Sequence, residues 1–491
     1  MTRRRWGVVL AACVTACLAS SPMGAQTPQW PAERPPSAIP MRPIAFPAYQ
    51  LKTLANGLQV LVIPRHEEPS VSFRLIIKAG AAEDPPDKPG VAGFVAALLA
   101  QGTTTRSSET IADTIESAGG VFGVGSTTEL SYVNAGVVKD RFAPLIDLAS
   151  DLVQHPAFAP QEIARQREQA LSSLTVSHDE AGVVADLAFD RLVFGAHPYG
   201  RPGNGTPESV RSITRTDLVA FHAAWFAPNN AILAIVGDLS ADEAFAAAER
   251  GFGTWAKHDV PRIATPDPPD PAPRIVVIDK PGAVQTEIRV GHLGVPRTHV
   301  DYVALNLAIR ILGGEGANRL FNDLRTDRAL TYGASADMQA LKLSGDFVAQ
   351  TSTRSEATGE TLRLVVDEFQ RLQRDPVDAR ELSGAQDYLA GSFPLTIETP
   401  SQIALQVLNR LFYGIDVKEL ETFRATVEAV TVADISRVTR QFLMPNRLSI
   451  VLVGDASKFL QQLTAQHFTE VEVIPLDQFD ATSATLRRAG K

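Results

Sequence analysis

Histidine and cysteine are the side chains that most often bind transition metals or act as nucleophiles, and this chain offers few usable arrangements of either. Two histidines three or four residues apart on a helix would present both imidazoles to one metal ion. No two of the nine histidines have that spacing, so none of them predicts a metal-binding helix. They are His66, His155, His178, His197, His222, His258, His292, His299 and His467.

Residues 1–25 have the pattern of a secretory signal. Arg3 to Arg5 precede an apolar stretch, Trp6 to Ala19, that is too short to span a membrane. Both cysteines of the chain lie in this segment, so cleavage after Ala25 would leave a mature protein without cysteine chemistry. The alternative is a bacterial lipobox ending at Cys17, which would give a lipid anchor. Either interpretation predicts an exported protein, located in the bacterial periplasm.

The length of 491 residues exceeds what one hydrophobic core usually supports and predicts two or more domains. Apolar residues make up 45% of the chain and charged residues 21%, as in soluble globular proteins. The formal charge is −9, and loss of the three arginines of the signal makes it −9 − 3 = −12. Such an acidic protein is not expected to bind nucleic acid.

Residues 214–238 and 431–455 follow the same pattern, 217 positions apart. Each stretch begins with Thr-x-x-Asp, continues to a Pro-Asn pair and ends in an apolar run before Gly-Asp. The pattern predicts a capped helix, a turn and a buried strand. Its repetition indicates an internal duplication. Residues 257–273, between the copies, contain six prolines and predict a stiff linker.

Each half mixes strands and helices without regular alternation, which favours the α+β class. The expected strands are Leu51–Leu54 and Leu58–Ile63 around an Asn-Gly turn, Val71–Lys78, and residues 275–278 and 286–292. The expected helices are residues 91–101, 108–118 with a stop at Gly119, 141–155, and further helices from Asp301 onward.

The chain resembles the pitrilysin (insulinase) family of zinc metallopeptidases from about Ala45 to Phe459. Besides the duplicated pattern, the segments that carry the resemblance are Leu54–Val62, Gly90–Thr103, His197–Gly200 and Arg319–Arg325. The resemblance implies two tandem homologous α+β domains. Their expected bounds are residues 45–256 and 274–480, joined by the linker 257–273.

Catalytic members of this family bind zinc through an inverted H-x-x-E-H helix and a later glutamate. Here Gly93 and Ala97 stand at the histidine positions and Ala96 at that of the general base. Ser173, 76 residues after Ala97, aligns with the later glutamate. Glycine and alanine have no donor atom, and a lone serine hydroxyl is a poor zinc ligand. We expect no metal or other cofactor in this chain, and no peptide cleavage by the chain alone.

Arg325 and Tyr332 match the substrate-binding Arg and Tyr of the family in type and separation. The resemblance implies that this pair binds the peptide and stabilises the oxyanion at a partner's zinc site. An isolated Arg-x6-Tyr would more often be a solvated arginine and a tyrosine that begins a strand on its core face. Residues 119–129, rich in glycine, stand where catalytic members present an edge strand to the peptide; they fit either peptide addition or a twisted, packed strand.

Two functions agree with these features. The first is the zinc-less subunit of a heterodimeric metallopeptidase, whose partner is a homologue with H-x-x-E-H and bound zinc. The second is a peptide-binding or scaffold protein without enzymatic activity. Arg325 and Tyr332 favour the first, because a scaffold needs no oxyanion donors.

Overall fold

The computed structural model describes residues 46–270, 272–314, 316 and 318–488. The predicted signal, residues 1–25 with Cys17, lies outside the described residues, so export and lipid attachment stay predictions. In the described part of the chain, no helix combines the length and the apolar character that a membrane span requires.

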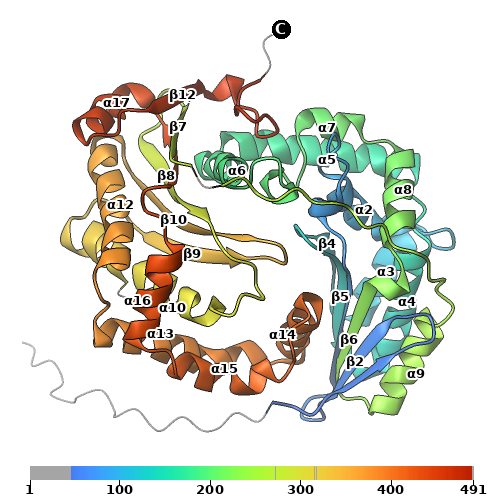
Figure 1. Cartoon of the computed structure of the whole chain (residues 1–491). Helices are drawn as coiled ribbons and strands as arrows, with labels where there is room; N and C mark the ends of the chain where they lie inside the picture. Colours follow the sequence, from blue (N-terminus) through green and yellow to red (C-terminus); the bar gives the residue numbers. More distant parts are fainter. Residues whose placement is uncertain (1–45, 271, 315, 317, 489–491) are drawn as a thin grey trace, which may run out of the picture. The chain divides into compact units, whose positions relative to one another are not determined.

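The first half builds a six-stranded sheet in the order β1-β2-β6-β3-β5-β4 (Figure 1). β2 and β6 are parallel, and the other neighbours are antiparallel. The strands are β1 (Gln50–Thr53), β2 (Gln59–Pro64), β3 (Ser70–Ile77), β4 (Val121–Ser126), β5 (Ser131–Val138) and β6 (Ala231–Gly237). The predicted hairpin is confirmed: Leu51 pairs with Leu61 across it, and Gly57 has φ +94° in the turn, which favours glycine.

The helices predicted at residues 91–101, 108–118 and 141–155 form, with ends that differ by at most two residues. Ser107 caps α3 through a hydrogen bond from the Thr110 amide, and Gly119 ends it with φ +63°. The helices are α2 (Val91–Leu99), α3 (Ser108–Ala118), α4 (Phe142–Gln154), α5 (Pro160–Asp179), α6 (Ala181–Phe194), α7 (Pro207–Ser212), α8 (Arg215–Trp225) and α9 (Ala241–Phe252).

The second half builds another six-stranded sheet in the order β12-β7-β11-β8-β10-β9. Its strands are β7 (Arg274–Asp279), β8 (Gln285–Leu293), β9 (Ala334–Ala340), β10 (Gly345–Arg354), β11 (Ser449–Gly454) and β12 (Val471–Pro475). Its helices are α10 (Tyr302–Gly313), α11 (Arg319–Phe321), α12 (Thr358–Arg374), α13 (Ala379–Ser392), α14 (Pro400–Tyr413), α15 (Glu419–Glu428), α16 (Val432–Phe442) and α17 (Ala456–Ala465).

The two sheets share one topology, as the internal duplication predicts. The repeated stretches form α8 with β6 and α16 with β11, and each helix is capped reciprocally by Thr214 with Asp217 or by Thr431 with Asp434. β6 and β11 both lie third in their sheets, each beside one parallel and one antiparallel neighbour. The sheets differ in one edge strand. In the first sheet this strand, β1, precedes the other strands in sequence, whereas in the second sheet the corresponding strand, β12, follows all the others.

Each half also supplies a helix that packs on the other half's sheet. Buried residues of α14, including Ile403 and Val407, form one core with Leu61, Ile63 and Ile232 of the first sheet. On the second sheet, the same place is taken by α6, which contacts β8 and β11. Folding of either half therefore depends on apolar area that the other half covers.

Candidate functional site

Helix α2 carries three of the four positions that correspond to zinc-site residues. Ala96 is completely buried, whereas Gly93 and Ala97 are partly exposed. A Cβ added at Gly93 would meet no atom within 4 Å, so space for a side chain exists there. Ser173 lies exposed on α5, a helix that contacts α2.

These four positions do not fit a zinc ion, because their only side-chain donor is the hydroxyl of Ser173. Across residues 46–488, apart from the three undescribed positions among them, no group of three or more histidine, cysteine, aspartate or glutamate side chains is arranged to hold a metal ion.

Buried hydrogen bonds hold the N-terminus of α2 in place. Both carboxylate oxygens of Asp84, 2% exposed, accept hydrogen bonds from backbone amides, at 2.6 Å from Gly90 and 2.7 Å from Ala92. Such bonds satisfy amides that have no partner within the helix. Burial nevertheless raises the pKa of Asp84 to about 7. Asp84 thus still holds the start of α2 in place, although this helix has no zinc-binding side chains.

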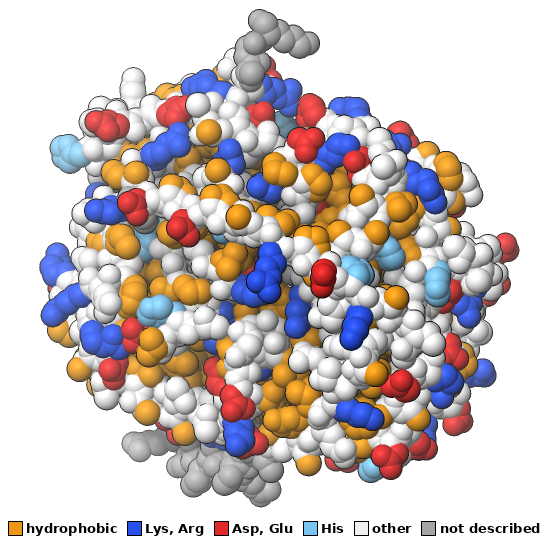
Figure 2. Space-filling model, turned by 45° about the vertical axis from the view of Figure 1, so that its right-hand side comes forward, with side chains coloured by type: hydrophobic (Ala, Val, Ile, Leu, Met, Phe, Trp, Pro, Cys, Tyr) orange, Lys and Arg blue, Asp and Glu red, His pale blue; other side chains and the backbone are white. Residues whose placement is uncertain are grey.

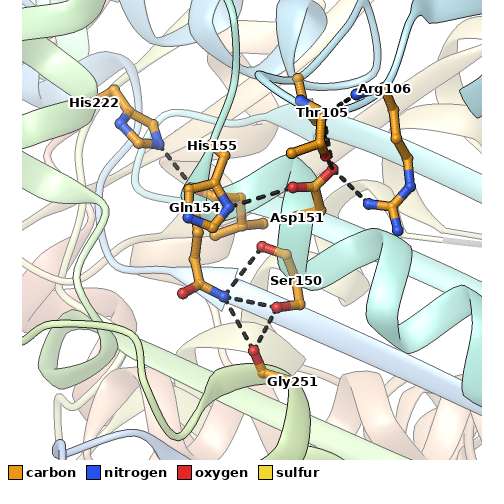
Figure 3. Close-up of polar contacts among 10 residues, drawn as sticks. Thr105, Arg106, Ser150, Asp151, Gln154, His155, His222 and Gly251 are labelled. Carbon is orange, nitrogen blue, oxygen red and sulfur yellow. Dashed lines mark hydrogen bonds and ion pairs between the residues drawn. The ribbon is translucent and has the colours of Figure 1, made fainter.

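The loop that follows α2 is tied to α4 through Asp151 (Figure 3). The Asp151 carboxylate accepts hydrogen bonds from the hydroxyls of Thr103, at 2.7 Å, and Thr105, at 3.1 Å, and from the Arg106 guanidinium. His155, which directly follows the end of α4, places Nδ1 3.3 Å from the other carboxylate oxygen. Burial acts to raise the pKa of Asp151, but the hydrogen bonds from Thr103, Arg106 and Thr105 lower it below its usual value.

Arg325 lies on a π-helical turn, η5 (Asn322–Asp327), that continues α11. The neighbouring Leu324 is completely buried, and the exposed Arg325 places its guanidinium carbon 5.0 Å from the centre of the Phe321 ring. Isolated π-helical turns are frequent at functional sites. Residues 319–327 are therefore helical, and the second part of this helix is wider than an α-helix.

Tyr332 lies two residues before β9, and 83% of its surface is exposed. The alternative interpretation, a tyrosine on the core face of a strand, is therefore wrong. The backbone around it is held by β10: the Thr331 hydroxyl donates to the Ser352 carbonyl at 2.7 Å, and the Thr351 hydroxyl donates to the Gly333 carbonyl at 2.8 Å. A fixed loop thus presents an exposed phenol.

The predicted edge strand is confirmed as β4, which lies at one end of the first sheet, and β9 occupies the matching end of the second. Val121, the first residue of β4, is 69% exposed. Both strands have an edge without a strand neighbour in the described part of the chain, where an added peptide strand could form hydrogen bonds.

Glu129 joins the turns that end these two edge hairpins. It lies in the turn between β4 and β5 and is 7% exposed, and its carboxylate accepts a hydrogen bond of 2.9 Å from the amide of Lys342, in the turn between β9 and β10. Tyr199 donates its hydroxyl hydrogen to Glu129 and accepts a 3.3 Å bond from the Leu343 amide. Tyr413, at the end of α14, donates to the second carboxylate oxygen at 3.2 Å. We call these contacts the Glu129 clasp.

A cavity of about 310 Å³ adjoins the clasp and contains Glu83 together with Glu129 and Tyr199. Burial raises the pKa of Glu83 to about 7, against a hydrogen bond from the Gly80 amide that lowers it. Burial and the bond to Glu129 raise the pKa of Tyr199 above its usual value. The charge of Glu83 therefore changes near neutral pH, whereas Tyr199 keeps its proton and can donate.

The sequence did not predict the clasp, although the family resemblance included His197–Gly200 and residues 119–129. Tyr199 and Glu129 belong to those segments, but they are 70 residues apart, and Tyr413 is 284 residues from Glu129. His197 is a buried turn residue whose Nδ1 accepts a hydrogen bond from the Tyr199 amide at 3.1 Å. It positions the clasp tyrosine.

The second half thus offers an exposed guanidinium at Arg325 and an exposed phenol at Tyr332, and each sheet has one of the free strand edges described above. Figure 2 shows hydrophobic side chains exposed in a band through the middle of one face, with lysine and arginine side chains near its centre.

Comparison with known proteins places both halves among peptidases. Residues 59–202 match the model "Insulinase (Peptidase family M16)", and residues 212–389 match "Peptidase M16 inactive domain". An uncharacterized zinc protease of Mycobacterium bovis is 27% identical over 438 residues, which are 88% of this chain and 99% of that protein. An uncharacterized zinc protease of Bacillus subtilis is 22% identical over 391 residues, 79% of this chain and 94% of that protein.

Among solved structures, a peptidase M16 inactive domain from Pseudomonas fluorescens is similar, with a TM-score of 0.78 and 30% identity over 83% of this chain and 98% of that one. A protease from Helicobacter pylori has the same TM-score at 19% identity, covering 84% of this chain and all of that one, which shows the fold alone.

Proposed function

Because the chain belongs to the M16 (insulinase) family of peptidases and lacks its zinc-binding side chains, we propose that it is the substrate-binding subunit of a two-chain metallopeptidase. In this proposal the partner is a homologue with an intact H-x-x-E-H helix, and the partner holds the zinc. The pair would act on peptides outside the cytoplasm, in agreement with the predicted signal.

One observation carries the proposal: donors suited to a peptide carbonyl are retained in a chain whose four zinc-site positions do not fit a zinc ion. Tyr332 is exposed on a loop that β10 holds in place, and Arg325 is exposed on a π-helical turn. An exposed tyrosine on an anchored loop contributes little to the core, so a role in binding accounts for it better than a role in folding.

The chemistry expected of the pair is electrostatic. When a carbonyl carbon is attacked, negative charge develops on its oxygen, and a fixed phenol or guanidinium hydrogen bond stabilises that charge more than it stabilises the ground state. Arg325 would also hold the peptide before reaction through a second carbonyl or a carboxylate. The free edges of β4 and β9 would align the peptide backbone.

The proposal is tested by co-expressing the chain with a zinc-bearing homologue from the same cell and measuring peptide hydrolysis by the purified pair. Tyr332→Phe should lower kcat by about 10² to 10³, as loss of other oxyanion donors does. Arg325→Ala should lower kcat/KM, and the split between kcat and KM separates transition-state from ground-state binding. The zinc content of the pair should stay unchanged.

Arg328→Ala is the matched control, because Arg328 lies beside the same turn but is bound to Asp323 at 2.9 Å. It should leave hydrolysis near the wild-type rate. If Tyr332→Phe and Arg325→Ala also hydrolyse peptide at the wild-type rate in an intact complex, the catalytic role of this pair is wrong and the peptide-binding or scaffold role remains.

A further inference from the structure

One face of α14 lines a cavity of about 720 Å³ between α10, α13 and α14. Four polar residues of this face recur at helical spacing, Gln402, Gln406, Asn409 and Tyr413, and Leu405 and Arg410 of the same helix also line the cavity. The opposite face, which includes Ile403 and Val407, is buried against the first sheet. The cavity therefore has a fixed polar wall, held from behind by the packing between the two halves.

Two arginines in this cavity share a single carboxylate. Arg297 donates to Glu419 at 3.1 Å, and Arg410 places Nε 3.5 Å from the other oxygen of Glu419. Among the described residues that line the cavity, none is aspartate or glutamate. Two guanidinium groups against one carboxylate leave an excess positive charge, which attracts an anion.

The geometry of both guanidinium groups is fixed. Arg297 stacks on Tyr302, with its guanidinium carbon 3.9 Å from the ring centre. Arg410 is 7% exposed and donates from Nη1 to Gln406 at 2.6 Å, while its buried Nε has no hydrogen bond within the described part of the chain. Nε meets Glu419 only at the ion-pair distance of 3.5 Å, so a ligand carboxylate beside this guanidinium would add a charge-assisted interaction.

The rim of the cavity is apolar and adjoins a free strand edge. Exposed side chains at the rim are Tyr388, 45% exposed, Leu395, 62%, and Leu405, 39%. Ala340, the last residue of β9, also lines the cavity. A peptide added along β9 would end beside an apolar rim and a cationic wall.

We propose that this cavity binds a carboxylate of the peptide substrate, and so selects peptides with an acidic side chain or a free C-terminus near the end of β9. Guanidinium groups fit carboxylates because their parallel N–H bonds match the two oxygens. The inference rests on the proposed peptide-binding function and names the class of peptide.

The test is fluorescence anisotropy with the purified full chain and three labelled peptides of equal length. One peptide is neutral with an amidated C-terminus, the second carries an internal glutamate, and the third is neutral with a free C-terminus. At least one carboxylate peptide should bind about tenfold more tightly than the neutral one, the effect of one charge-assisted hydrogen bond. Which of the two does so identifies the source of the carboxylate.

Two variants with opposite expected effects on the preference for carboxylate peptides distinguish a loss of binding contacts from damage to the fold. Arg410→Gln should remove the preference, whereas Glu419→Gln should increase it, because the second change frees both arginines from their only shared carboxylate. Damage to the fold would weaken binding in both variants. Arg363→Gln, which alters an exposed pair with Asp367 on α12, is the control and should change nothing.

Each result decides between the two proposals. If the three peptides bind with equal affinity, the carboxylate site is wrong while peptide binding stands. If no peptide binds, the proposed function and the carboxylate site are both contradicted. Should Arg410→Gln fail to fold, an unchanged preference in Glu419→Gln would by itself refute the carboxylate site.

Discussion

Gly93 lies in the interior of α2, where glycine destabilises a helix relative to alanine. An added Cβ would meet no atom within 4 Å. We expect Gly93→Ala to raise the free energy of unfolding by about 0.5–1 kcal/mol, mainly because alanine restricts the unfolded chain. Urea denaturation of the purified chain measures the change.

A glycine at the end of another helix provides the control. A Cβ at Gly313, in α10, would lie 2.2 Å from the Ala336 amide nitrogen, so Gly313→Ala should lower the stability. Equal shifts of both variants would show that the space beside Gly93 is not open. At Gly93, α2 therefore lacks a side chain with a metal-donor atom, although there is space for a side chain.

At the scale of elements, α2 and its following loop depend on Asp151 of α4. Asp151→Asn should lower the free energy of unfolding at pH 7 by about 1–3 kcal/mol, since it weakens charge-assisted hydrogen bonds from Thr103, Thr105 and Arg106. Urea denaturation at pH 7 measures this difference.

The stability difference between the wild type and Asp151→Asn should decrease as the pH falls. The folded-state pKa of Asp151 is lowered, so its contribution is complete above the unfolded-state pKa of about 3.9 and is lost as the pH falls through the folded value. The wild type and Asp151→Asn should therefore converge in stability below about pH 4. A difference that is constant from pH 7 to pH 3 would contradict the account.

At the scale of the whole described structure, the halves are joined by α6 and α14, each of which packs on the other half's sheet, and by the Glu129 clasp. Glu129→Ala should leave the Lys342 amide and the Tyr199 and Tyr413 hydroxyls without their acceptor. We expect faster amide hydrogen exchange in residues 127–130 and 341–344, and a loss of about 1–3 kcal/mol of stability.

Hydrogen exchange followed by mass spectrometry localises the change. Glu421→Ala removes an exposed carboxylate on α15 and should leave both turns unaffected. Unchanged protection of residues 341–344 in Glu129→Ala would mean that the other contacts between the halves hold these turns without the clasp.

The sequence alone determined the features that depend on neighbours along the chain. The hairpin around Gly57 and the capped helices at Thr214 and Thr431 formed as predicted, because turn and capping preferences act over a few residues. The α+β halves, the duplication and the family follow from the order of these short segments. The loss of donor atoms at Gly93, Ala96 and Ala97 is likewise visible in residue types.

Only the tertiary structure decided which distant residues meet. The exposure of Tyr332 depends on how β10 holds its loop, and no local pattern distinguishes that loop from the start of a buried strand. The sequence carried no prediction for the contacts of Glu129 and Glu419, because their partners Lys342 and Arg297 lie more than 100 positions away along the chain. Hydrogen bonds and ion pairs depend on distance in space, which the order of residues along the chain does not record.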